Sequence, residues 1–177
     1  MPRRVNFWIV GRNIVTNTVE TERLLLRSFK DEDAALLEQW LYASHVAPWY
    51  ENPEDWLNEV RERHDDFAFL THFIAEVDGN PVGFCQYYDC FDAIELEDWG
   101  IPISVPREVY SIDYLIGEAE YLQRGFGEEM IRQMLEVLCG LGAKKVIVQP
   151  EKSNEKSNRS LLANGFLWRG SYLVKPL

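Results

Sequence analysis

The chain has 177 residues, which suits one domain with a hydrophobic core, and 46% of them are apolar, which argues against a disordered chain. Its formal net charge of −11 argues against nonspecific binding to nucleic acid. The three cysteines cannot all pair and show no redox spacing, so a reducing cytoplasm is the expected location. The apolar run at 5–10 is too short to cross a membrane. We expect residues 1–18 to form an extra edge strand or a loose arm, followed by a single domain at 19–177.

The first elements are predicted to be a strand and two helices. Residues 21–29 are typical of a strand, and Asp31 is placed to cap a helix that continues through Tyr42. The sequence NPED at 52–55 offers a capping Asn, a Pro at the first helical position and acids in the first turn. It predicts a second helix that ends at about His64.

A hairpin and a long loop follow. Apolar segments at 67–77 and 82–88 are joined by DGNP, which is a good signal for a tight turn between two strands. Residues 89–107 carry two prolines and no clear periodicity, so we expect an irregular loop. Long loops in compact domains are often functional.

The second half is predicted to alternate strands and helices. We expect strands at 109–116, 144–149 and 166–174, with helices at 126–139 and 154–164. A central antiparallel run with a late strand–helix–strand segment indicates an α+β domain with a mixed sheet.

Charge is distributed unevenly along the chain. Residues 89–121 contain nine acids and one base, whereas residues 122–177 contain nine bases and five acids. Solvated faces could carry such a pattern by chance. The alternative is that two ligands of opposite charge meet on one domain.

Two glycines, Gly125 and Gly127, stand at the start of the amphipathic run that follows Arg124. A helix start presents unpaired N–H groups and the positive end of the helix dipole, and glycine lets a ligand approach the backbone closely. Such a turn can bind phosphate. The dinucleotide pattern GxGxxG fails because its third glycine is Met130, and the mononucleotide loop lacks its Gly-Lys-Ser/Thr ending.

The segments LQRGFGEEM (122–130) and NEKSNRSLLANGF (154–166) together resemble the GNAT acyltransferase superfamily. The resemblance implies a mixed, mostly antiparallel sheet splayed into a V with flanking helices, and acetyl-CoA bound in the cleft. No metal is expected, because histidines and cysteines lack metal-site spacing. The residues that the resemblance assigns to the coenzyme are Leu115, Ile116, Leu122, Gln123, Arg124, Gly125, Phe126, Gly127, Glu128, Asn154 and Ser157.

Three further segments, at 40–50, 83–88 and 111–127, resemble the aminoglycoside 6'-N-acetyltransferase branch of that superfamily. The resemblance implies transfer of acetyl to a primary amine of a cationic small molecule, by a monomer or homodimer. Alternatives are an enzyme of the same fold acting on a polyamine, a siderophore precursor or a protein N-terminus. A further alternative is a non-catalytic protein that senses acyl-CoA or a cation.

Acetyl transfer needs a group that receives the amine and a donor for the charge that develops on the carbonyl oxygen. Asp113 is the candidate for binding and orienting the ammonium, and a backbone amide at Leu115 or Ile116 is the candidate donor. Asp113 could instead be a polar residue on the solvent side of a strand.

The acceptor pocket is expected to combine acids with flat aromatic surfaces. A solvated loop and aromatic residues that plug the core are the plainer alternatives. The candidates are Trp49, Tyr50, Gln86, Asp92, Glu95, Glu97, Asp98, Trp99 and Asp113.

The chain departs from the superfamily pattern at two positions. Leu122 replaces Gln or Arg, which a backbone-amide site tolerates. Leu161 replaces the Tyr that usually donates a proton to the departing thiolate, and leucine has no proton to donate. Another group or water must then do this, and Tyr121 is close enough in sequence to be considered.

Overall fold

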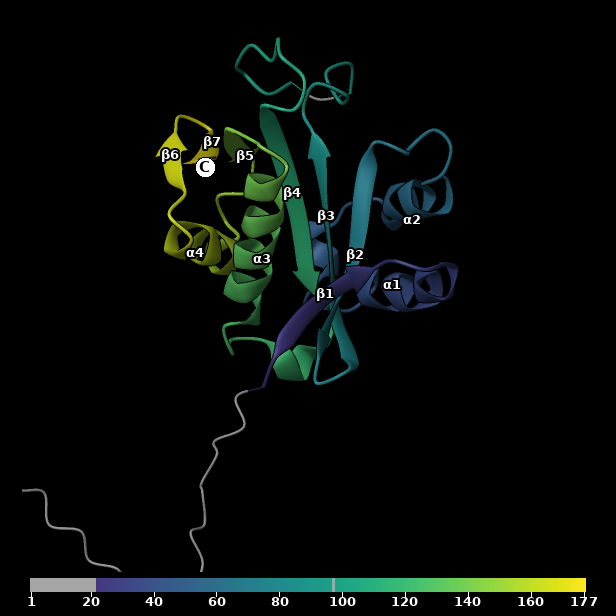
Figure 1. The fold of residues 1–177 in the computed structure, drawn as a ribbon. Helices are drawn as coiled ribbons and strands as arrows, with labels where there is room; N and C mark the ends of the chain where they lie inside the picture. The colour runs from purple at the N-terminus through teal and green to yellow at the C-terminus, as the bar shows by residue number, and fades with distance from the viewer. Residues whose placement is uncertain (1–21, 97) are drawn as a thin grey trace, which may run out of the picture.

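The computed structural model describes residues 22–96 and 98–177, so the expectation for residues 1–18 falls outside the described residues (Figure 1). One seven-stranded sheet has the order β1-β2-β3-β4-β5-β7-β6 and is flanked by helices, which confirms the α+β prediction. The strands are β1 (Leu24–Ser28), β2 (Leu70–Val77), β3 (Asn80–Asp89), β4 (Val109–Ile116), β5 (Lys145–Val148), β6 (Leu167–Arg169) and β7 (Tyr172–Pro176). The helices are α1 (Ala34–Leu41), α2 (Pro53–Arg61), α3 (Phe126–Gly140) and α4 (Glu155–Ala163).

The helices cover opposite faces of the sheet, as Figure 1 shows. One core cluster joins α3 and α4 to the strands through buried side chains that include Met130, Met134 and Leu161. The other joins α1 and α2 to the opposite face and includes Trp40 and Phe84. Strand side chains alternate between the two faces, so the central strands β2, β3 and β4 supply both clusters.

The sheet opens between β4 and β5. Every neighbouring pair of strands is antiparallel except these two, which run parallel and pair at only two positions, Val109 with Lys145 and Tyr110 with Val146. Beyond Tyr110 the strands diverge (Figure 1), and residues 111–116 of β4 leave the β5 ladder. The expected V-shaped sheet is therefore present.

The β2–β3 hairpin confirms its sequence signal. The two-residue loop of Asp78 and Gly79 has φ values of 51° and 82°. Positive φ at both positions is the requirement of a type I′ turn, which matches the twist of the paired strands. Strand β2 begins at Leu70 rather than at 67.

Two helix starts differ from the predictions. Asp31 lies inside a 3₁₀ turn, Asp31–Asp33, with Lys30 at its N-cap, and α1 begins only at Ala34. Asn52 does precede α2, but its backbone is left-handed and its side chain makes no capping hydrogen bond. Helix α2 also ends at Arg61, before His64.

The C-terminal strand expected at 166–174 is wrong in its extent. Two strands, β6 and β7, form an antiparallel hairpin there, and the chain turns at Gly170, whose φ of +66° favours glycine. Because β7 pairs with β5, the hairpin closes the half of the sheet beyond the opening.

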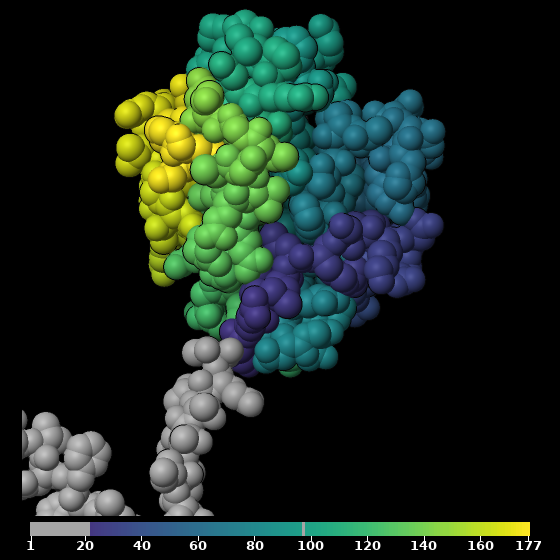
Figure 2. Space-filling view, in the orientation of Figure 1, coloured from purple at the N-terminus to yellow at the C-terminus, as the bar shows by residue number. Residues whose placement is uncertain are grey.

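The loop expected at 89–107 is irregular, and part of it packs against the ends of the strands. Ala93, Trp99 and Ile103 are buried in a third cluster, and the loop forms a knob at one end of the molecule (Figure 2). Buried Asp89 accepts hydrogen bonds from the backbone N–H groups of Phe91 and Arg107, one on each carboxylate oxygen. One carboxylate thus holds the two ends of the loop together.

All three cysteines are free thiols. Within the described residues, no helix has the length and apolar character that crossing a membrane requires. The same residues contain no cluster of three His, Cys, Asp or Glu side chains suited to a metal ion.

Candidate active site

A cavity of about 860 Å³ runs along β4 at the opening of the sheet. Its walls are β4, the turn before α3, the start of α4 and the connection between α1 and α2. This volume falls within the range of small-molecule sites.

The glycine turn at the mouth of α3 is open to this cavity. Gly125 occupies the N-cap with φ +85° and no side chain caps the helix. A Cβ built on Gly125 would meet nothing within 4 Å, and one on Gly127 would have Ser160 Oγ at 3.6 Å. The first N–H groups of a 15-residue helix therefore face the cavity beside free space, which is the arrangement that binds phosphate.

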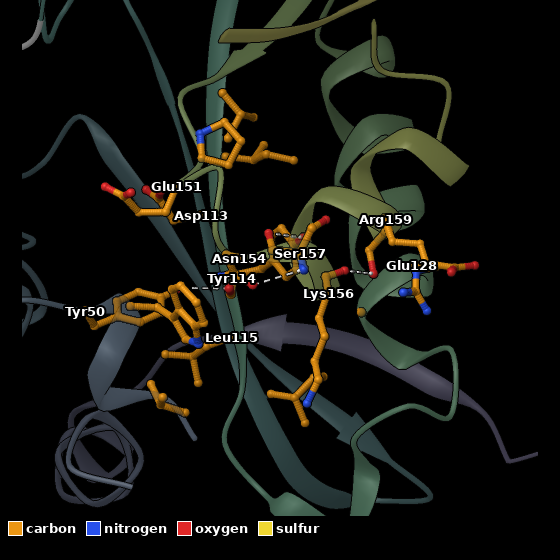
Figure 3. Close-up of a pocket in the computed structure, with 18 of the residues that line it drawn as sticks. Tyr50, Asp113, Tyr114, Leu115, Glu128, Glu151, Asn154, Lys156, Ser157 and Arg159 are labelled. Carbon is orange, nitrogen blue, oxygen red and sulfur yellow. Dashed lines mark hydrogen bonds between the residues drawn. The ribbon is translucent and has the colours of Figure 1, made fainter. Parts of the chain in front are cut away.

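Basic side chains from α4 lie near this turn. Lys156 and Arg159 line the cavity together with Asn154 and Ser157 (Figure 3). Asn154 caps α4, because its side-chain oxygen accepts a hydrogen bond from Ser157 N at 3.2 Å. A diphosphate at the turn would meet helix dipole and positive charge together.

Two residues expected near the coenzyme lie elsewhere. The Arg124 guanidinium packs 5.1 Å from the Tyr121 ring centroid and 5.4 Å from that of Phe126, and it pairs with Glu22. Phe126 is buried in the core below the turn. The remaining expected coenzyme residues line the cavity: Leu115, Ile116, Leu122, Gln123, Gly125, Gly127, Glu128, Asn154 and Ser157.

Alternate residues of β4 direct their backbone groups to opposite sides. Just past the strand, Gly117 N donates to Val82 O at 2.8 Å. Leu115 O points the same way, since a Cβ built on Gly83 would lie 2.4 Å from it. The N–H and C=O groups of odd-numbered residues therefore face β3.

The backbone N–H and C=O groups of the even-numbered residues face the cavity. Tyr114 O accepts a hydrogen bond from Tyr50 Oη at 2.6 Å, and Ile116 O accepts one from His45 Nε2 at 3.0 Å. The amide of Leu115 thus points into the sheet, whereas the amide of Ile116 faces the opening. Of the two expected oxyanion donors, the geometry favours Ile116.

Asp113 lies on the α1–α2 side of the cavity and is held by a neighbouring strand. Gln86 of β3 donates from Nε2 to Asp113 Oδ2 and to Glu59 Oε2, each at 3.1 Å. Gln86 is only 2% exposed, so it stands behind the cavity wall rather than in it. Glu151, which follows β5, lines the same cavity as Asp113 (Figure 3). This end of the cavity is therefore acidic, whereas the end at α4 carries Lys156 and Arg159 together with Glu128 and Glu155.

Aromatic residues complete the acidic end. Trp49, Tyr50 and Trp99 line the cavity as expected. Tyr50 packs edge-on against Trp56 with the ring centroids 4.8 Å apart. Burial, with Asp113 nearby, raises the pKa of Tyr50, so its hydroxyl stays protonated and keeps donating to Tyr114 O.

The acids of the long loop lie elsewhere. Asp92, Glu95 and Asp98 are exposed and outside the cavity lining, and Glu97 is not among the described residues. Asp98 instead accepts a hydrogen bond from Gly100 N at 2.9 Å. The acidic wall comes from Asp113 and Glu151.

Comparison with known proteins agrees with this architecture. Residues 30–171 match the family model described as "Acetyltransferase (GNAT) domain". The chain belongs to the GNAT acetyltransferase family.

Relatives of this GNAT domain carry a consistent name. Aminoglycoside N(6')-acetyltransferase type 1 from Klebsiella pneumoniae and the protein of that name from Serratia marcescens are each 28% identical to it over 170 residues. The match covers 92% of this chain and 82% of each relative.

Solved structures share the fold. AAC(6')-Ib in complex with coenzyme A and kanamycin has a TM-score of 0.73 at 26% identity, with 87% of this chain and 95% of that chain covered. An aminoglycoside N(6')acetyltransferase from Legionella pneumophila has a TM-score of 0.71 at 18% identity and covers 90% and 95% of the two chains. At that identity the likeness shows the GNAT fold alone.

At the position where GNAT enzymes usually have a tyrosine, this chain has a leucine in the core. Leu161 is fully buried in the core between α3, α4 and the sheet. Ser157 lies one turn earlier on α4. The Tyr114 hydroxyl is 2.8 Å from Ser157 Oγ and donates to Ser157 O at 3.1 Å. Side chains on a helix lean toward its N-terminus, so a tyrosine at 161 would cover the region that Tyr114 occupies.

The cavity residues that sequence reasoning missed include Tyr114, Glu151, Lys156 and Arg159. Tyr114 follows Asp113 in a strand, and alternation alone implied that the two side chains face opposite sides of the sheet. Glu151 lies just after the strand that pairs in parallel with β4, and the ends of parallel strands meet at one edge. Lys156 and Arg159 lie within the motif that gave the resemblance.

Proposed function

We propose that this GNAT enzyme transfers acetyl from acetyl-CoA to the 6' amine of an aminoglycoside. The observation that carries the proposal is one cavity with an open, uncapped helix start and basic side chains at one end, and Asp113 with Glu151 at the other. A polyanionic coenzyme and a polycationic acceptor would each meet the opposite charge. The relatives' names and the bound kanamycin in one structure support this acceptor.

The residues present suit acetyl-CoA at the glycine turn. The backbone amides of the turn at 122–128, with the side chains of Lys156 and Arg159, would hold its phosphates, and its pantetheine would lie along the free edge of β4. When bound, it supplies a thioester whose acetyl group is transferred and whose thiolate leaves.

The acceptor's ammonium would be held by Asp113, and water would carry away the proton that the amine must lose before it attacks. An ordinary carboxylate is too weak a base to deprotonate an alkylammonium by itself. The Ile116 amide would donate to the oxygen on which negative charge develops. Tyr114 would donate its phenolic proton to the departing sulfur, and water would restore it.

The function is tested by thiol release from acetyl-CoA, followed with a thiol-reactive dye, against kanamycin, ribostamycin and spermidine. We expect release with an aminoglycoside and acetylation of its 6' amine by NMR. Release with spermidine alone would assign a polyamine acceptor. Tight acetyl-CoA binding without release from any amine would identify a non-catalytic sensor.

Tyr114→Phe tests the proton donor. We expect kcat to fall about tenfold, less than the 10²–10⁴-fold that is usual for acid catalysis, because thiolates leave readily, with acetyl-CoA affinity unchanged. Burial raises the pKa of Tyr114 to about 12, so the phenol is protonated across the working range. The phenol should also lower the pKa of the bound coenzyme A thiol, measured by thiolate absorbance, and the variant should raise it.

The matched control is Tyr121→Phe, which removes a cavity hydroxyl from the Arg124 cluster. Equal losses in the two variants, or an unchanged thiol pKa in Tyr114→Phe, would contradict the assignment to Tyr114.

A further inference from the structure

A row of polar side chains crosses three strands behind Asp113. His72 of β2 is the register partner of Gln86 in β3, and Gln86 is the partner of Asp113 in β4. Residues directly opposite each other on neighbouring strands project from the same face, so all three lie on the α1–α2 face. Asp113 is the end of the row that reaches the cavity (Figure 3).

The amide of Gln86 has a fixed orientation at its nitrogen. Nε2 donates to the carboxylates of both Glu59 and Asp113, and an ionised carboxylate can only accept. A flipped amide would place its oxygen against two negative groups. Gln86 Oε1 therefore points away from them, and among the described residues it is buried without a hydrogen-bond partner.

His72 presents a second buried polar atom. Its Nε2 also lacks a hydrogen-bond partner among the described residues, and the residue is 6% exposed. The ring lies among apolar neighbours, with centroids 6.2 Å from Phe29 and 5.9 Å from Phe84. Burial and the nearby Arg63 charge lower the pKa of His72 to about 4, so the imidazole is neutral and has one N–H.

We propose that His72 and Gln86 are positioning residues for Asp113. His72 Nε2–H donates to one buried water, which in turn donates to Gln86 Oε1, and this bridge locks the amide that holds the carboxylate. The bridge gives both unsatisfied atoms a partner, and buried polar atoms are rarely left without one. The role of Asp113 in holding the acceptor rests on the proposed function.

A double-mutant cycle in thermal unfolding tests the hydrogen bond without any substrate. His72→Phe keeps an aromatic ring but leaves Gln86 Oε1 unpaired, so we expect Tm to fall by about 3 °C or more. Gln86→Met removes that oxygen, and in its background His72→Phe should leave Tm unchanged or raise it. Equal effects of His72→Phe in the two backgrounds would overturn the hydrogen bond.

Kanamycin binding tests the positioning role. We expect His72→Phe to weaken kanamycin affinity by calorimetry about five- to tenfold and to leave acetyl-CoA affinity unchanged. His72→Gln, which retains an N–H donor, should restore most of the loss. Unchanged kanamycin affinity in His72→Phe, or no restoration by His72→Gln, would overturn it. A wild-type protein that acetylates no amine would refute the proposed function but leave the unfolding cycle intact.

Discussion

Asp113→Asn should lower kcat/KM for an active aminoglycoside by about 10²-fold, within the range for a positioned acid–base or charged group. The substitution keeps the shape of the side chain and its hydrogen-bonding capacity toward Gln86 Nε2, but it removes the negative charge that would hold an ammonium. Steady-state kinetics with kanamycin measure the effect on the acceptor, and calorimetry measures the affinity for acetyl-CoA separately. Coenzyme affinity should hardly change.

The control for this prediction is Asp92→Asn, which removes one negative charge from the exposed loop outside the cavity. It should leave kcat/KM within about twofold of wild type, since an exposed charge is well screened at physiological salt. An Asp113→Asn enzyme with wild-type kinetics toward every active amine would refute the assigned role.

Gly125→Val should weaken acetyl-CoA binding by about 10²-fold, because it combines two effects. The backbone at Gly125 has φ +85°, a conformation that costs a side-chain-bearing residue about 1–2 kcal/mol. The new side chain would also stand in the free space before the α3 amides, where a phosphate would bind. Calorimetric titration with coenzyme A measures the loss.

Gly142→Val separates these two effects. Gly142 has φ +83° and equally open surroundings, but it lies at the far end of α3 and outside the cavity lining. Both variants should lose similar stability in urea unfolding, and only Gly125→Val should lose coenzyme affinity. A similar affinity loss in both would show that strain, rather than occlusion of a phosphate site, is responsible.

Local signals predicted most of the fold. The Asp78–Gly79 turn, the start of α3 at Phe126 and the Asn154 cap of α4 each follow from a few adjacent residues. Helix ends and strand breaks were less predictable. Gly170 splits the segment at 166–174 into two strands, and its role depends on how β7 pairs with β5.

The candidate site likewise has parts that the local sequence predicted and parts that it did not. The glycine turn was predicted because its chemistry lies in the backbone of consecutive residues. The acidic wall was assigned to the long loop because its charges are dense, yet Asp92 and Asp98 face solvent. Glu151 is brought into the same cavity as Asp113 only by the tertiary arrangement (Figure 3). To select Tyr114 as a candidate, one had to know that Leu161 is in the core and that residue 157 lies opposite β4.

The short pairing of β4 with β5 also has a mechanical consequence. Two register pairs join the four-stranded half of the sheet to the three-stranded half, so the seam between them has little stiffness of its own. A molecule that binds in the gap and contacts both halves bridges them where the strands do not pair. Its binding then raises the free energy of unfolding by RT ln(1 + [L]/Kd), so the enzyme would be most rigid while it holds the substrate that it is about to cleave.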